Sequence, residues 1–302
     1  MSNYRTSRGF EQALKEAARV LEKKYGRPAD IIMQEFWRGR LLARIFHSGD
    51  SNFVLKGGTS LLARIPTARR TRDLDLSIID GREKERAIEE LEFLTKIDLE
   101  DFFRFELISV ESLKQEKEFL SIYRLRYRVF IGINERTTIS IDLALGCNPT
   151  APIETMRPKN IEGLLLSNPP YQLYPLVDHI ADKVCAIIEK HGSKGDQESS
   201  RVKDLVDLCI IACNETVESR PLAFAIHSEA YICGIFPLVE FKVPDKWLTH
   251  PEQYRSQAKG VLIDELADNQ DQAVRLVKSF IDPVLSENLE QRIWRPKEKQ
   301  WS

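Results

Sequence analysis

Two aspartates separated by one residue mark the stretch of this sequence best suited to chemistry. Asp73 and Asp75 lie in "DLDLSII", where apolar residues at 74, 76 and 78 alternate with polar ones. This alternation predicts a strand with both carboxylates on one face, about 7 Å apart at the backbone. Carboxylate oxygens are the ligands that hard cations such as Mg²⁺ prefer. A surface strand has the same pattern, so other residues must decide between the two readings.

A third carboxylate stands on a later stretch that also predicts a strand. In "TTISIDLALG" the apolar side chains face one way, and Asp142 lies on the opposite face with Ser140 and Ala144. If the two strands are neighbours, three carboxylates can hold two metal ions roughly 3.5–4 Å apart. Such a pair of ions stabilises the attacking and leaving oxygens of an in-line displacement.

A double glycine precedes the first aspartates. Gly57 and Gly58 follow the short apolar stretch "NFVLK" and precede "TSLLARI", which predicts one or two helical turns. Strand, double glycine and helix start form the layout of a phosphate-binding turn, where backbone N–H groups face the ligand. Each feature alone is ordinary, but the glycines and three carboxylates together favour catalysis on a nucleotide.

Arginines gather in two places although the formal net charge of the chain is −2. One group precedes Asp73. The other lies at period two in "YRLRYRV", so Arg124, Arg126 and Arg128 share a strand face. Such a face attracts phosphate if it is exposed, and the plainer interpretation is a solvated strand face. The low net charge argues against a nucleic-acid binder that is basic overall.

The order of the predicted elements indicates an α/β (α+β) protein in two parts. Residues 1–160 predict a mixed sheet with flanking and N-terminal helices, and residues 161–302 predict a mainly helical C-terminal lobe with a charged, frayed end, "RPKEKQWS". In the first part, helices are expected at 7–25, about 29–47 and 83–97, and strands at 102–109, 121–131 and 137–145.

Composition points to a cytoplasmic protein. No apolar run among the 302 residues approaches the roughly 20 that a membrane span needs, and no secretory signal is visible. The five cysteines form no CxxC pair, and Cys209 and Cys213 have helical spacing. We therefore expect buried, reduced thiols and neither a disulfide nor a metal site.

The combination "LKGGTSLL…RRTRDLDLSI…ISIDLALG" resembles the minimal nucleotidyltransferase fold, and specifically the AbiEii/AbiGii-type nucleotidyltransferase toxins with their MenT group. The later stretch "YPLVDHIADKVCAII…RVKDLVDLCII" is similar to the family's helical lysine and Lys/Arg-Asp-Leu-x-Asp-Leu motif. The resemblance covers about 50–80 and 137–212, in the family's order.

The resemblance implies roles for the early motif. The double glycine, with Thr59 or Ser60, would hold the triphosphate of an NTP substrate. Asp73 and Asp75 would bind two Mg²⁺ ions, with Mn²⁺ as an alternative. Asp142 corresponds to the third carboxylate, which binds metal and helps to deprotonate the attacking hydroxyl.

The resemblance also implies roles for the late motif and for the segment before Asp73. Lys183 would contact the nucleotide phosphates, and Asp204 and Asp207 correspond to the late acidic motif. Without the resemblance, a helical lysine is a solvated charge and these aspartates are caps or pairs within a helix bundle. Thr71 stands where relatives often have serine, and a phosphate on its hydroxyl would repel metal and substrate.

The family transfers a nucleoside monophosphate from an NTP and releases pyrophosphate, and several members act on the tRNA 3′ acceptor end. The resemblance therefore implies a toxin that blocks aminoacylation and translation and is controlled by an antitoxin. Candidate RNA-binding residues are Arg69, Arg70, Arg72, Arg124, Arg126 and Arg128. The alternatives are transfer to a protein or small molecule, and an inactive nucleotide-binding module.

Overall fold

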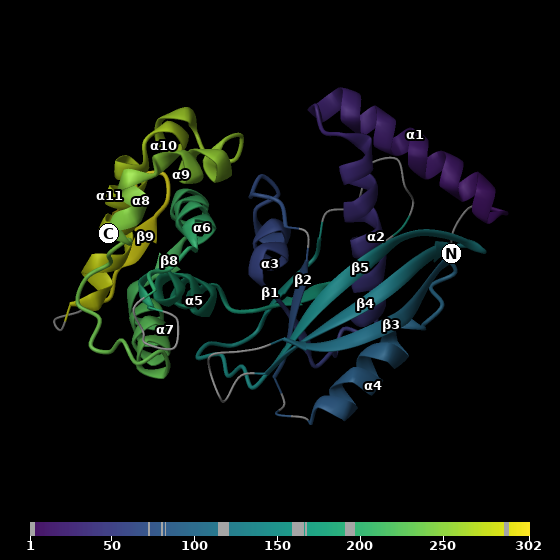
Figure 1. The fold of residues 1–302 in the computed structure, drawn as a ribbon, viewed down its shortest axis with the longest axis horizontal. Coiled ribbons are helices and arrows are strands. Elements are labelled where there is room, and N and C mark those ends of the chain that lie inside the picture. The colour runs from purple at the N-terminus through teal and green to yellow at the C-terminus, as the bar shows by residue number, and fades with distance from the viewer. Residues whose placement is uncertain are drawn as a thin grey trace. The chain divides into compact units, whose positions relative to one another are not determined.

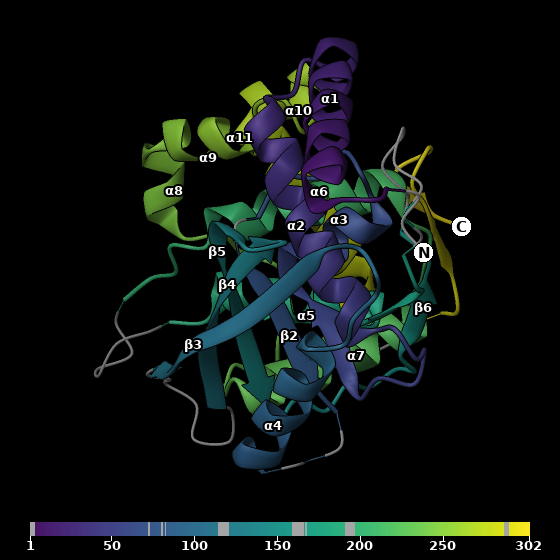
Figure 2. The same cartoon turned by 90° about the vertical axis from the view of Figure 1, so that its right-hand side faces the viewer.

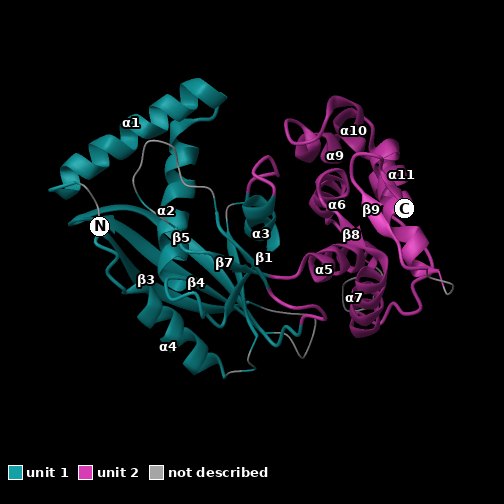
Figure 3. Cartoon of the chain, turned by 180° about the vertical axis from the view of Figure 1, so that it is seen from behind, with its two compact units in different colours: residues 1–64, 71–148, 154–173 teal, residues 65–70, 149–153, 174–302 magenta. Residues whose placement is uncertain are grey.

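The computed structural model describes residues 4–71, 73–79, 81, 83–113, 121–158, 166, 168–190, 197–286 and 290–302. Contacts divide the chain into two compact units (Figure 3). The first unit comprises residues 1–64, 71–148 and 154–173, and the second comprises 65–70, 149–153 and 174–302. Whether 1–160 and 161–302 are separate domains stays a prediction.

A seven-stranded mixed sheet organises the described part of the first unit, in the order β3-β4-β5-β2-β1-β7-β6. Strand β2 runs parallel to β5 and antiparallel to β1, so the two stretches with the predicted carboxylates are neighbours. The strands are β1 Phe53–Lys56, β2 Leu74–Ile78, β3 Phe103–Leu113, β4 Ser121–Ile131, β5 Asn134–Leu145, β6 Glu154–Met156 and β7 Tyr171–Leu173. This mixed sheet with flanking helices confirms the predicted fold class.

The core of the first unit is formed by the sheet together with helices that pack on it (Figures 1 and 2). They are α1 Ser7–Tyr25, α2 Ala29–Ile45, α3 Gly57–Arg64 and α4 Lys84–Thr95. Side chains of α1, α2 and α4 form one hydrophobic cluster with the apolar face of the sheet, which includes Leu74, Leu76 and Ile141. The apolar alternation therefore buries one face, and the polar residues between lie on the other.

Helix α2 carries two buried arginines that the sequence pattern does not explain. Arg40 and Arg44 both bond to Asp101, whose side chain is fully buried before β3. Burial alone would raise the pKa of Asp101, but the hydrogen bonds and charges of the two arginines hold it below its usual value. This pairing joins α2 to the start of β3.

The second unit is mainly helical in its described part. Its helices are α5 Leu176–Ile188, α6 Val202–Asn214, α7 Ser219–Ile232, α8 Asp245–Thr249, α9 Pro251–Ala258, α10 Asp264–Asp268 and α11 Gln270–Ile281, followed by a 3₁₀ turn, Asp282–Leu285. A small sheet orders β10 Gln300–Trp301, β9 Ile293–Arg295 and β8 Val217–Glu218.

The expectation of a frayed end is wrong. Trp294 is fully buried, donates its indole N–H to the carbonyl of Ala212, and contacts the ring of Phe280 at 4.8 Å between centroids. Trp301 stacks on Phe280 at 5.9 Å. The end of the chain is ordered because the ring of Trp294 is buried and that of half-buried Trp301 stacks on Phe280, although the neighbouring residues are polar.

None of the five cysteines forms a disulfide in the structure. Only Cys185 and Cys209 are buried, whereas the other three are half-buried, so the expectation of burial was wrong for Cys147, Cys213 and Cys233. Within the described residues, no helix is long and apolar enough to span a membrane.

Candidate functional site

Strand register lines up five charged residues across the sheet of the first unit. Asp75 on β2 is the partner of Asp142 on β5 and of Lys56 on β1, while Asp142 is also the partner of Arg124 on β4. Arg124 is in turn the partner of Glu111 on β3. Paired residues share a face of a sheet. We call this line the charged row: Glu111, Arg124, Asp142, Asp75 and Lys56.

The double glycine is required by the close approach of Asp75. Gly57 has a φ of 60°, and a Cβ there would overlap the Asp75 carboxylate, lying 2.7 Å from its Cγ. A Cβ on Gly58 would lie 2.9 Å from the Cβ of Thr71. Only glycine accommodates both a left-handed backbone and this contact at position 57. The start of α3 therefore lies directly against one carboxylate of the charged row.

The segment that leads into β2 is held by side chains from α2 and α3 and by its own Thr71. The hydroxyls of Thr59 and Thr71 both donate to the carbonyl of Asp73, at 3.2 and 3.3 Å. Arg38 donates to the carbonyl of Thr71 at 2.7 Å. Asp73 itself is half-buried and immediately precedes β2. These contacts tie the approach to Asp73 to α3 and α2.

The predicted triphosphate contacts on α3 have different surroundings. Thr59 is half-buried, whereas Ser60 is fully buried and its hydroxyl has no hydrogen-bond partner among the described residues. The roles of both residues in nucleotide binding stay predictions.

The three arginines of β4 share a face as their spacing predicts, and each is paired with a carboxylate. Arg124 donates from Nε and Nη2 to the two oxygens of Asp142, both at 2.7 Å. Arg126 approaches Glu111 at 3.5 Å, and Arg128 donates to Glu106 at 2.7 Å. Pairing with Asp142 raises the pKa of Arg124 above its usual value. The face therefore carries a row of ion pairs, and the predicted RNA-binding roles of these arginines stay predictions.

The donors present suit a hard divalent cation. Asp73, Asp75 and Asp142 offer carboxylate oxygens and are all half-buried. Because Gly57 has no Cβ, the Asp75 carboxylate can lie directly against it. As the described side chains stand, however, no three acidic, histidine or cysteine residues are gathered closely enough to hold a metal ion. The carboxylate of Asp142 pairs with Arg124 in this arrangement.

A second group of charges is buried between α5 and α6 of the second unit. Lys183 donates to Asp204 at 2.9 Å and to Asp207 at 2.6 Å. Arg201 donates to Asp204 at 2.6 Å, and Arg69 approaches both oxygens of Asp207 at 2.8 Å. We call these five residues the lysine cluster. The structure thus brings together the three residues that the late motif singled out, and their predicted roles stay predictions.

The central residues of the lysine cluster stay ionised although they are buried, because opposite charges lie next to one another. Burial alone would lower the pKa of Lys183, but the charges and hydrogen bonds of Asp204 and Asp207 raise it. Burial alone would raise the pKa of Asp204, but Lys183 and Arg201 hold it well below its usual value. The side chains of Lys183, Asp204 and Asp207 are 6%, 1% and 0% exposed, so these three ions are buried.

Two further residues alter the interpretation of this region. Lys203 was missed, although it stands in the quoted "RVKDL". Its side chain reaches the surface, and partial desolvation and then the charge of Arg201 lower its pKa. Arg69, predicted to bind RNA, is held by Asp207. Among its predicted companions, Arg70 is exposed and Arg72 lies outside the described residues.

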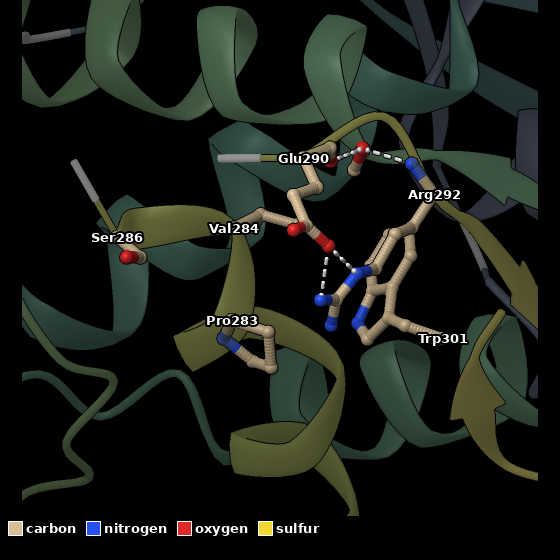
Figure 4. Close-up of a pocket in the computed structure, with 7 residues that line it drawn as sticks. Pro283, Val284, Ser286, Glu290, Arg292 and Trp301 are labelled. Carbon is tan, nitrogen blue, oxygen red and sulfur yellow. Dashed lines mark hydrogen bonds and ion pairs between the residues drawn. The ribbon is translucent and has the colours of Figure 1, made fainter. Parts of the chain in front are cut away.

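A cavity of about 240 Å³ also opens in the second unit. It is lined by Ser219, Pro283, Val284, Ser286, Glu290, Arg292 and Trp301 (Figure 4). The polar groups on its wall bond to one another: Arg292 pairs with Glu290, and Ser219 donates to the Glu290 carbonyl. The cavity contains none of the residues that the sequence motifs singled out.

The mixed sheet of the first unit thus carries the double glycine and the neighbouring carboxylates Asp75 and Asp142. The family model described as nucleotidyl transferase AbiEii toxin, type IV toxin–antitoxin system, matches residues 40–276. The chain belongs to this family, as the resemblance predicted.

Two solved structures resemble the chain at low sequence identity. MenT4, a nucleotidyltransferase toxin from Mycobacterium tuberculosis, is 15% identical with a TM-score of 0.48, over 87% of this chain and 99% of its own. JHP933 from Helicobacter pylori is 17% identical with a TM-score of 0.45, over 84% of this chain and 92% of its own. No curated protein sequence matches the chain significantly.

Proposed function

We propose that this chain is the toxin of a toxin–antitoxin system and transfers a nucleoside monophosphate from an NTP to the 3′ acceptor end of tRNA. One observation carries the proposal. Within the range matched by the family, the double glycine at the start of α3 lies against Asp75, which stands beside Asp142 in the charged row. This arrangement combines backbone N–H groups suited to phosphate with carboxylates suited to divalent cations.

The residues of the first unit would act on the reacting atoms. Asp73, Asp75 and Asp142 would hold two Mg²⁺ ions, which supply Lewis-acid stabilisation of the attacking and leaving oxygens. The backbone N–H groups at Gly57 and Gly58 would bind the triphosphate. Asp142 would accept the proton of the attacking hydroxyl. That oxygen then bonds to the α-phosphorus while the bond to the β-phosphate breaks and pyrophosphate leaves.

The lysine cluster would attract the phosphates of the nucleotide or of the RNA. It has three cations, Arg69, Lys183 and Arg201, against two carboxylates, and Lys203 adds another cation nearby. An excess of positive charge attracts a triphosphate or an RNA backbone. Lys183 would contact the nucleotide phosphates while Asp204 and Asp207 keep its ammonium group in place.

The acceptor and partners follow from the same proposal. Exposed Arg70, together with Arg72, would contact the phosphates of an acceptor stem. Blocking the 3′ end would stop aminoacylation and translation in the cytoplasm, and a cognate antitoxin would control the activity.

A labelling experiment tests the proposal. Purified protein is incubated with each α-³²P-labelled NTP, Mg²⁺ and total tRNA, and the products are separated on a denaturing gel. We expect label on tRNA with one or two NTPs, loss of label with Asp75→Ala, and full activity with Asp50→Ala, which removes an exposed aspartate elsewhere in the first unit. Label on protein would move the acceptor to a protein hydroxyl. Absence of label on any acceptor despite bound NTP would favour a nucleotide-binding module.

The hydroxyl of Thr71 is a proposed point of control. It donates to the carbonyl of Asp73, and its Cβ lies where a side chain on Gly58 would project. A phosphate on Thr71 would break this contact and repel metal and triphosphate. A partner kinase should therefore inhibit the wild-type chain and fail to inhibit Thr71→Ala. Equal inhibition of both would refute this mode of control.

A further inference from the structure

Both oxygens of the Asp142 carboxylate accept hydrogen bonds from the same side chain. Arg124 donates two parallel hydrogen bonds to its two oxygens at 2.7 Å. The side chain of Asp142 is 17% exposed and that of Arg124 is 30% exposed, so solvent and ions reach the pair. Bidentate, charge-assisted bonds of this kind are among the stronger hydrogen bonds in proteins.

The position of this pair in the charged row explains why it forms. Asp75 and Asp142 are partners on neighbouring parallel strands, and neighbouring strands lie about 4.8 Å apart. Two carboxylates at that spacing repel each other unless a cation lies between or beside them. Arg124, the partner of Asp142 on the other side, supplies that cation from within the chain.

We infer that Arg124 is a positioning residue that competes with a divalent cation for the carboxylate of Asp142. A cation that binds the edge of the Asp142 carboxylate facing Arg124 can do so only when at least one of the two guanidinium hydrogen bonds breaks. Arg124 thus weakens metal binding at Asp142 until a second anion receives the displaced guanidinium. The triphosphate of the substrate is such an anion, so metal binding becomes coupled to nucleotide binding. This inference rests on the proposed role of Asp142 in holding metal.

The test measures Mn²⁺ binding by the full chain, using the electron paramagnetic resonance signal of free Mn²⁺ in a titration without nucleotide. Breaking a hydrogen bond to a charged group is worth about a tenfold change in affinity. We therefore expect Arg124→Ala to bind Mn²⁺ about tenfold more tightly than the wild type. Arg124→Gln, which keeps part of the side chain, is the second variant should Arg124→Ala fold poorly.

Arg126→Ala is the matched control. Arg126 lies two residues away on the same face of β4 but pairs with Glu111. Its removal changes the net charge by the same amount without freeing Asp142, so the Mn²⁺ affinity should change less than twofold. An equal gain in both variants would reduce the effect to general electrostatics and overturn the inference.

A double-mutant cycle shows whether Arg124 acts through Asp142. In the Asp142→Ala background, Arg124→Ala should leave Mn²⁺ affinity unchanged. A non-hydrolysable NTP analogue should also reduce the tenfold difference between wild type and Arg124→Ala. Persistence of the full effect without Asp142 would overturn the inference.

The failure of the inference is distinguishable from failure of the proposed function. Mn²⁺ binding that depends on Asp142 but does not respond to Arg124→Ala contradicts the inference alone. Mn²⁺ binding that is unaffected by Asp73→Ala, Asp75→Ala and Asp142→Ala contradicts the proposed metal site itself, and the inference with it.

Discussion

The two groups of charges in this chain use similar residues in opposite ways. The charged row of the first unit has three carboxylates against two cations, and its members are partly exposed. The lysine cluster of the second unit has three cations against two carboxylates, and its central ions are buried. The row therefore carries an excess of negative charge, and the cluster carries an excess of positive charge.

Burial determines how much stability each group contributes. An exposed ion pair is worth about 0–1 kcal/mol, so a ligand can rearrange the partly exposed charged row more easily than the buried cluster. Removing one partner from a buried pair leaves an uncompensated charge and costs about 3–5 kcal/mol. We therefore expect variants of the charged row to lose activity with little loss of stability, and variants of the lysine cluster to lose stability.

The largest effect is expected for Asp75→Asn. This change removes a carboxylate of the proposed metal site but leaves a side chain of similar volume beside Gly57. Metal-held charge stabilisation is worth several kcal/mol, so transfer to tRNA should fall by at least about a thousandfold. Initial-rate labelling measures this, and the melting temperature should stay within about 2 °C. Loss of folding together with activity would remove the distinction between row and cluster.

The next effect concerns Asp207→Asn in the lysine cluster. Asp207 accepts from Lys183 and Arg69 and is fully buried. The free energy of unfolding should fall by about 3–5 kcal/mol. Urea denaturation measures it, with Glu111→Gln in the exposed row as the control, which should change stability by less than about 0.5 kcal/mol. Similar losses for the two variants would show that burial does not separate the groups.

A smaller effect is expected for Gly57→Ala, which joins backbone strain to a steric overlap with Asp75. We expect a loss of about 2–3 kcal/mol in unfolding free energy, together with loss of transfer activity. Gly26→Ala is the matched control, because Gly26 has a φ of 65° and no atom within 4 Å of an added Cβ. It should lose only about 1–2 kcal/mol and keep its activity. Equal effects on activity would argue against a special role for the contact at Gly57.

The smallest expected effect is a pH dependence. The folded-state pKa of Asp204 lies below the unfolded value of 3.8, so its contribution to stability is present above pH 3.8 and is lost as the pH falls further. Chemical denaturation at several acid pH values should therefore show a steeper loss below about pH 4 for the wild type than for Asp204→Asn. Parallel curves would mean that Asp204 does not stabilise the fold through its charge.

Much of the fold could be predicted because its patterns are local. The period-two alternation around Asp75 and Asp142 predicted both strands and the face on which each carboxylate lies. The double glycine predicted the turn into α3, and the structure supplies its reason in the contact with Asp75. The tail was mispredicted because local polarity does not reveal the burial of Trp294.

The partners of the charged residues could not be predicted. Nothing local to Arg124 indicates Asp142, since their pairing depends on the register of β4 against β5. Likewise, Arg69 pairs with Asp207, which lies 138 residues later in the sequence. The sequence offered both arginines as candidates for RNA binding, and in the structure each pairs with a carboxylate.

By itself, therefore, the sequence determined the elements, the faces of the strands, the glycine turn and the family. Those properties follow from side-chain period and backbone freedom within a few residues. Only the tertiary structure decided which carboxylates are exposed beside one another and which are neutralised in the interior. Strand register and helix packing join residues far apart in the chain, and burial then sets the strength of each charge pair.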